Sequence, residues 1–96
     1  LANALIQTVK PNSTLKLSAK GTTDPDDDKL NYKWWHYKEA GTYKGNIEIQ
    51  NAYAQDASLM VPDDAGKAET IHIICEVTDD GAPPLTRYQR VIIKIE

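Results

Sequence analysis

Hydrophobic and polar residues alternate with a period of two along most of this chain, and no stretch shows a convincing 3.6-residue period. The clearest run is 13–21, "STLKLSAKG", in which Leu15 and Leu17 alternate with Lys16 and Ser18. Successive side chains of a β-strand point to opposite faces of its sheet, so this pattern predicts a strand buried on one face. Runs of this kind restrict the chain to a fold built from sheets.

Seven such runs follow one another, and turn-forming residues separate them. The expected strands cover 5–9, 13–21, 29–37, 46–50, 57–61, 69–78 and 87–96. Seven short strands in 96 residues predict an all-β protein, a seven-stranded antiparallel β-sandwich of immunoglobulin type. We expect residues 1–96 to form this one domain, cut from a longer protein, because the chain starts at Leu1 rather than Met.

Two adjacent tryptophans lie in the third expected strand, where neighbouring side chains must point to opposite faces. In an immunoglobulin topology the third, sixth and seventh strands are neighbours in one sheet. Each strand has two rows of side chains, and the row with more apolar residues should face the core. This places Trp34 in the core and Trp35 on the outer face. The outer row would then contain Trp35, Tyr37, Ile74, Tyr88 and Ile92. The alternative is a different strand register, in which a loop covers Trp35.

Such an outer row would be a binding surface, because converging apolar side chains usually mark binding sites or interfaces. Aromatic rings stack on the apolar faces of sugars, and a flat sheet face suits an extended polysaccharide. The expected binding residues are Trp35, Tyr37, Tyr43 and Tyr88, with His72 and Arg90 as polar partners. The same rings could instead dock onto a neighbouring domain, since aromatic residues are also enriched in protein interfaces.

The acidic run "DPDDD" at 24–28 allows either a calcium site or a turn. Asp24 and Asp26 could be joined by Asp79 and Asp80 if the two loops meet at one end of the sandwich, and calcium prefers such oxygen ligands. The helical calcium-loop pattern fails, because its sixth and twelfth positions lack glycine and glutamate. Aspartates also cap turns by accepting backbone N–H bonds, so the run needs no cation or other cofactor.

The sequence offers no convincing catalytic set, so we expect a protein that is not an enzyme. The two histidines, His36 and His72, lie in strands, and no nucleophile elbow or phosphate-binding glycine loop is present. The single cysteine, Cys75, excludes an internal disulfide, and its apolar surroundings predict a buried, inert thiol.

Charge and hydropathy exclude two classes of partner. The formal net charge is −3 with the charges interspersed, so the basic stripe needed for nucleic acid or an anionic membrane is absent. No apolar run approaches 18 residues, so no membrane-spanning helix is expected.

Two segments together resemble a known family. "DPDDDKLNYKWWHYKEAGTY" and "VPDDAGKAETIHIICEVTDDGAPPLTRYQRVIIKI" are similar to the immunoglobulin-like C-terminal domain of secreted bacterial proteins of a cellulose-binding family. The resemblance covers roughly residues 10 to 96 and includes the spacing from "WW.YKEAGTY" to "VTDDG.P.LTRY". The shorter pattern of "DPD" with a later "VTDDG" is shared by many cadherin-like and polycystic-kidney-disease-like (PKD-like) modules.

The resemblance implies a non-catalytic accessory module that follows a larger domain similar to nucleoside hydrolases. It implies export, to the periplasm, the cell surface or the medium of a polysaccharide-degrading bacterium. Either a polysaccharide or the preceding domain of the same chain could then be the partner of the aromatic residues.

Overall fold

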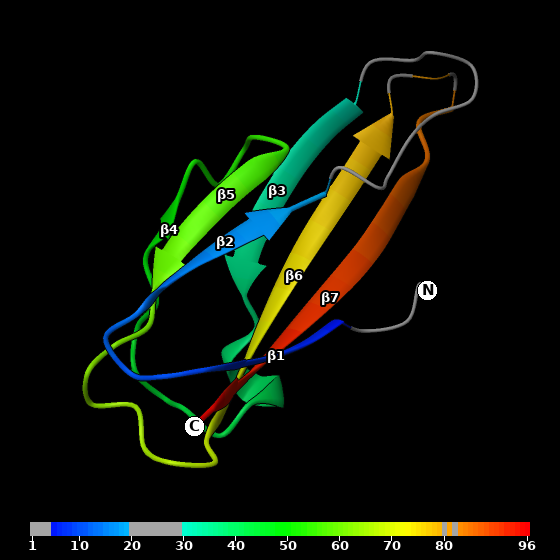
Figure 1. Cartoon of the computed structure of the whole chain (residues 1–96). Coiled ribbons are helices and arrows are strands. Elements are labelled where there is room, and N and C mark those ends of the chain that lie inside the picture. Colours follow the sequence, from blue (N-terminus) through cyan, green and yellow to red (C-terminus); the bar gives the residue numbers. More distant parts are fainter. Residues whose placement is uncertain (1–4, 20–29, 80, 82) are drawn as a thin grey trace.

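The computed structural model describes residues 5–19, 30–79, 81 and 83–96, which form two packed β-sheets (Figure 1). The described strands are β1 (Leu5–Val9), β2 (Thr14–Ser18), β3 (Leu30–His36), β4 (Ile49–Gln50), β5 (Asp56–Met60), β6 (Thr70–Asp79) and β7 (Thr86–Ile95). A 3-10 turn, η1 (Lys38–Ala40), follows β3. The larger sheet has the order β1-β7-β6-β3, and the smaller has the order β2-β5-β4. The predicted all-β sandwich is confirmed, with β3, β6 and β7 as neighbours.

One strand pair departs from the predicted antiparallel arrangement. β1 runs parallel to β7, with Leu5 opposite Val91 and Val9 opposite Ile95, whereas all other described pairs are antiparallel. Parallel neighbours need a long connection, and here the whole rest of the domain lies between the two strands. The prediction of a purely antiparallel sandwich is therefore wrong at this edge.

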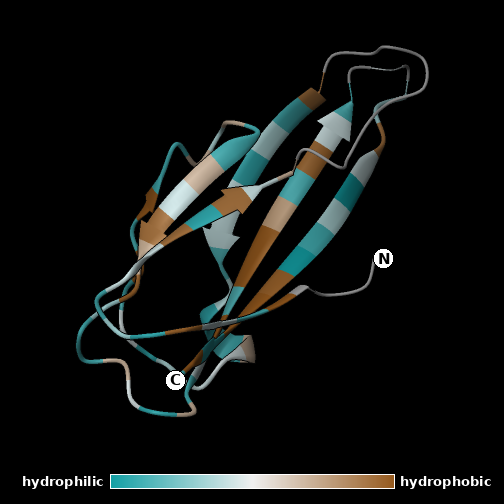
Figure 2. Ribbon diagram, viewed as in Figure 1, coloured by the Kyte–Doolittle hydropathy of each residue, from teal (hydrophilic) through white to brown (hydrophobic). Residues whose placement is uncertain are grey.

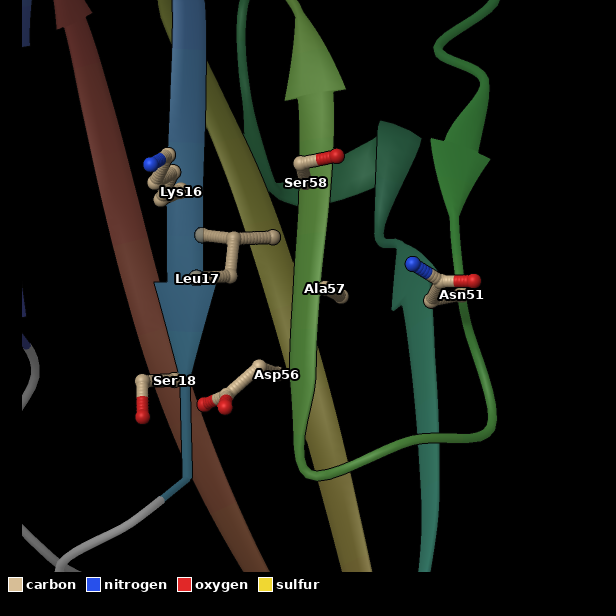
Figure 3. A pocket seen from close by; sticks show the side chains of 7 residues that line it. All are labelled: Lys16, Leu17, Ser18, Asn51, Asp56, Ala57 and Ser58. Atoms are coloured by element: carbon tan, nitrogen blue, oxygen red, sulfur yellow. The ribbon is translucent and has the colours of Figure 1, made fainter.

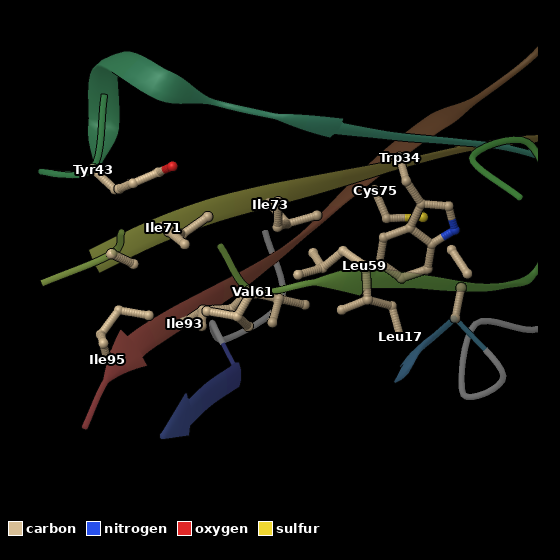
Figure 4. Packing of buried hydrophobic residues seen from close by; sticks show 14 of the residues in the cluster. Leu17, Trp34, Tyr43, Leu59, Val61, Ile71, Ile73, Cys75, Ile93 and Ile95 are labelled. Atoms are coloured by element: carbon tan, nitrogen blue, oxygen red, sulfur yellow. The ribbon is translucent and has the colours of Figure 1, made fainter. Parts of the chain in front are cut away.

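The core lies between the inner faces of the two sheets (Figure 4). Alternate residues of β6 and β7 supply about half of its buried side chains, as the predicted apolar rows require: Ile71, Ile73, Cys75 and Val77 from β6, and Val91, Ile93 and Ile95 from β7. Brown segments also concentrate in the lower halves of β6 and β7 in Figure 2. Cys75 has no exposed surface, and burial raises the pKa of its thiol to about 11, as expected of an inert cysteine.

Trp34 occupies the predicted core position. Its side chain is 3% exposed, and its indole Nε1–H donates a 2.9 Å hydrogen bond to the carbonyl oxygen of Ala54. Its backbone N–H donates to the carbonyl of Ala52 at 2.7 Å. Both acceptors belong to the segment between β4 and β5, so Trp34 joins the edge of the larger sheet to the smaller one.

Candidate binding face

The outer side of the larger sheet carries all but one of the side chains that the sequence assigned to a binding surface. We call this surface the aromatic face, and it consists of Trp35, Tyr37, His72, Ile74, Tyr88, Arg90 and Ile92. The strand register brings these residues together, because Ile74 lies opposite both Trp35 and Arg90, and His72 lies opposite Ile92. Tyr37 continues the row beyond β3, since its backbone N–H donates to the carbonyl of His72 at 2.8 Å.

Trp35, Tyr37 and Arg90 form a packed group toward the β3 edge of this face. The ring centroids of Trp35 and Tyr37 are 5.4 Å apart, and the planes are tilted by 47°. The guanidinium carbon of Arg90 lies 5.8 Å from the centroid of the Tyr37 ring, within the range of a cation–π interaction. Trp35 is therefore partly buried rather than fully open, and Ile74 between Trp35 and Arg90 retains only 5% exposure.

The open part of the aromatic face lies toward β7 and β1. Tyr88 is 45% exposed, and Ile6 of β1, which lies opposite Ile92, is 68% exposed. Ile6 was missing from the predicted set. Alternation in "LIQTV" does place Ile6 and Thr8 on one face, but the sequence does not show that β1 joins this sheet beside β7.

The two histidines of the neighbouring strands both have pKa values lowered from 6.5. Burial is the main cause for each, and Lys38 adds repulsion at His36 while Arg90 adds repulsion at His72. His36 Nε2 and His72 Nδ1 are buried without a hydrogen-bond partner among the described residues. The pKa of His72 thus keeps its imidazole neutral near pH 7, able to donate or accept a hydrogen bond.

Trp35 shares this lack of a partner. Its indole Nε1 is buried, and no hydrogen-bond acceptor for it exists in the part of the chain that the structure describes. A buried unpaired donor carries a free-energy cost, so the position of Trp35 is held by packing against its neighbours rather than by hydrogen bonding.

Tyr43 does not belong to the aromatic face, and its predicted place on the exposed platform is wrong. Its ring is 6% exposed in the core, and its hydroxyl donates a 2.8 Å hydrogen bond to Asp64 Oδ1. This bond, together with burial, raises the pKa of Tyr43 to about 12. The backbone N–H groups of Thr42 and Tyr43 both donate to the carbonyl of Thr70, which turns the loop after η1 back onto β6 and carries the ring inward.

Asp79, the one proposed calcium ligand among the described residues, acts as a turn cap. Its Oδ1 accepts hydrogen bonds from the backbone N–H groups of Gly81, at 3.1 Å, and Leu85, at 2.9 Å. These two bonds lower the pKa of its carboxyl group. Asp24 and Asp26 lie outside the described residues, and no cluster of three or more potential metal ligands occurs within the described ranges. Calcium binding therefore stays a prediction.

No helix in the described part of the chain is long and apolar enough to cross a membrane.

Two solved structures have folds similar to that of this chain. A structure described as a nucleoside hydrolase-related hypothetical protein from Saccharophagus degradans, associated with carbohydrate metabolism, matches 97% of this chain with a TM-score of 0.92 and 38% identity. The chain covers 22% of that protein, about a fifth of its length. The PKD domain from KIAA 1837 protein matches 99% of this chain and 83% of its own, with a TM-score of 0.63 and 19% identity, which supports the fold alone.

A search of curated proteins finds no match. The model of one domain family, by contrast, matches residues 14–95, nearly the whole chain. Because that match includes six of the seven described strands, the chain belongs to the family described as the C-terminal domain of cellulose-binding protein Sde0182.

Proposed function

We propose that this domain is a non-catalytic accessory module that binds a cellulose-like polysaccharide through the aromatic face. The observation that carries the proposal is the gathering of Trp35, Tyr37 and Tyr88 on one outer sheet surface with Arg90 and His72. Large apolar side chains at a sheet surface expose area that water disfavours, and a ligand with apolar ring faces can cover it.

The polar members of the face fit the hydroxyl groups of a sugar. Arg90 supplies several N–H donors in a fixed geometry, whereas Nδ1 of His72 is buried, so the His72 imidazole can offer a ligand only its other ring nitrogen. Tyr88, at 45% exposure, has both a ring face and a hydroxyl available to a ligand. A polysaccharide that stacks along Tyr88 and Trp35 would place its hydroxyls beside Arg90, which lies in one row with Ile74 and Trp35.

Two comparisons support a role in carbohydrate binding. The matching family is described by a cellulose-binding protein, and the similar structure at 38% identity is associated with carbohydrate metabolism. Because an insoluble polymer is met outside the cytoplasm, we place the module in the periplasm, at the cell surface or in the medium.

Docking onto another domain of the same chain is the second candidate, and two observations favour it. The 47° tilt between the Trp35 and Tyr37 rings departs from a flat stacking platform, and the aliphatic Ile6 and Ile92 extend the face. The similar structure is several times longer than this chain and is described as nucleoside hydrolase-related, so a hydrolase-like domain is the proposed docking partner.

Sedimentation with insoluble cellulose distinguishes the two functions. The isolated domain should bind cellulose, and Tyr88→Ala should weaken binding without unfolding the protein. Leu85→Ala is the matched control, because Leu85 is also exposed, at 59%, but lies in the turn before β7. A domain that stays in solution with cellulose, yet self-associates through this face, would support docking and contradict sugar binding.

A further inference from the structure

The outer edge of β1 is the least protected strand edge in the described part of the two sheets. β1 ends the larger sheet, whose order is β1-β7-β6-β3. Its sequence "LIQTV" contains no charge and no proline, its ladder with β7 has no bulge, and Ile6, Gln7 and Thr8 are exposed. Natural proteins use charges, proline and bulges to protect edge strands, because an open edge pairs readily with another strand. β1 has none of these protections.

The other edges of the described sheets are better protected. The edge of β3 is partly covered, because the N–H of Trp34 donates a 2.7 Å hydrogen bond to the carbonyl of Ala52. β2 carries the exposed Lys16 (Figure 3), and β4 has only two residues. Lysine side chains and very short strands both oppose edge pairing. A further strand is therefore expected to add at β1.

The pairing of β1 with β7 determines which backbone groups face outward. Val9 directs its backbone groups toward β7, since its carbonyl accepts a 2.8 Å hydrogen bond from the N–H of Glu96. Successive residues of a strand direct these groups to alternate sides, so Gln7 also faces β7, whereas Ile6 and Thr8 face away. No strand in the described part of the chain pairs with this outer side. The edge thus offers donors and acceptors at alternate residues, as an added strand requires.

We propose that β1 pairs with β1 of a second copy of this chain, antiparallel and about a two-fold axis at Gln7. In this register Ile6 of one copy lies opposite Thr8 of the other, and the two residues exchange both N–H···O=C bonds. The axis repeats this exchange on its other side, so the same edge serves both copies. The side chain of Ile6, which is 68% exposed, then packs beside Thr8 of the second copy.

The charges around β1 favour a second copy as the occupant. Residues 5–9 are uncharged, so no like charges meet within the strand pair. The nearest charged residue in the sequence is Lys10, and the two Lys10 residues lie roughly 20 Å apart along the strands, at about 3.4 Å per residue. This separation exceeds the Debye length of about 8 Å at physiological ionic strength, so their repulsion is largely screened. Lys94 lies opposite Thr8 on β7, one strand further from the axis.

The pairing would join the larger sheets of the two copies into one continuous sheet. Residues that lie opposite each other in an antiparallel pair point to the same face, so both aromatic faces would lie on one side of the dimer. Two sites on one assembly raise its avidity for a polymer surface. Only this consequence rests on the proposed function, since the pairing itself uses the backbone of β1.

The test is analytical ultracentrifugation of the 96-residue chain over a series of concentrations up to millimolar. A weak, reversible dimer should form, because one strand pair is a small interface. Thr8→Pro should raise the dissociation constant of the dimer at least about tenfold, because proline removes the outward N–H. Thr8→Ala is the matched control, since it keeps this N–H and should dimerise like the original chain. Circular dichroism should show both variants folded, because the N–H of Thr8 faces away from β7.

Charges at the axis provide a second test that leaves every backbone group in place. Gln7→Lys and Gln7→Glu each place like charges directly opposite each other, so each variant alone should dimerise more weakly than the original chain. A mixture of the two variants places opposite charges together and should restore dimerisation as a heterodimer.

Three results would overturn the proposal. The first is a chain that stays monomeric at millimolar concentration, and the second is equal dimerisation of Thr8→Pro and Thr8→Ala. The third is a dimer that Tyr88→Ala weakens and Thr8→Pro leaves intact, because self-association would then belong to the aromatic face. Sugar binding is measured separately by sedimentation with cellulose, so its failure would leave the dimer of β1 edges standing.

Discussion

Trp34 and Trp35 are consecutive residues of β3, yet they contact opposite sides of the four-stranded sheet. Trp34 is 3% exposed between the two sheets and bonds to the carbonyl of Ala54 at 2.9 Å. Trp35 packs on the outer side, with its ring centroid 5.4 Å from that of Tyr37. The pair thus divides its roles: the first residue stabilises the fold, and the second forms part of the surface that we propose for ligand binding.

This division predicts unequal effects on stability. Trp34→Ala should lower the free energy of unfolding by about 3–5 kcal/mol, because it leaves a large cavity and removes a hydrogen bond. Trp35→Ala should cost less than about 2 kcal/mol, since its ring is only partly buried. Urea unfolding followed by circular dichroism measures both values. Equal losses for the two variants would refute the assignment of the two faces.

Tyr43 should contribute to stability and not to sugar binding. Tyr43→Phe removes the hydroxyl that donates to Asp64, and it should lower the free energy of unfolding by about 1–3 kcal/mol, as expected for a hydrogen bond to a charged group. Cellulose sedimentation by this variant should equal that of the original chain. If the variant is as stable as the original chain but sediments less with cellulose, Tyr43 takes part in binding.

The stability of the domain should decrease as the pH falls from about 7.5 to about 5, in part through His36 and His72. Their pKa values are lowered in the folded protein, so near pH 6.5 the unfolded chain binds more protons. The stabilisation from the neutral histidines is fully present above the unfolded pKa of about 6.5 and is lost as the pH falls through the folded values. Urea midpoints across this range measure the effect.

The matched variant for this pH effect carries both His36→Gln and His72→Gln. Its urea midpoint should change less over the same range, because neither replacement side chain titrates. If the double variant loses as much stability as the original chain, other groups cause the decline.

Asp79 should stabilise the turn before β7 without help from a cation. Asp79→Ala removes the acceptor for the N–H groups of Gly81 and Leu85 and should lower the thermal midpoint, whereas Asp79→Asn keeps an acceptor oxygen and should lower it less. The predicted calcium site of Asp24, Asp26 and Asp79 is tested in the same assay. Calcium should raise the midpoint of the original chain if the site exists, and chelation should then reverse the rise.

Local alternation was enough to predict where the strands lie and which side chains of β3, β6 and β7 face the core. The core positions of Trp34, Ile73 and Ile93 follow from a period of two, which depends only on neighbouring residues. The partial burial of Trp35 could not be predicted from this period, because it depends on the packing of the Tyr37 ring against Trp35 and of the Arg90 side chain against Tyr37.

Features that depend on contacts between distant segments of the chain could not be predicted from the sequence. Tyr43 lies in a loop with no periodic pattern, and only its contacts with Thr70 and Asp64 turn it inward. The parallel β1–β7 pair and the exposed place of Ile6 depend on topology. β4 has only two residues, whereas the alternation in 46–50 predicted a longer strand.

The central claim is that the aromatic face binds sugar, and an NMR titration of the chain with a soluble cello-oligosaccharide tests it most directly. The Trp35 indole N–H signal and the backbone amides of Tyr37 and Tyr88 should shift and saturate, and Tyr88→Ala should weaken the response. If these signals stay unmoved at millimolar ligand, the aromatic face does not bind cellulose-like chains, and docking onto a neighbouring domain becomes its function.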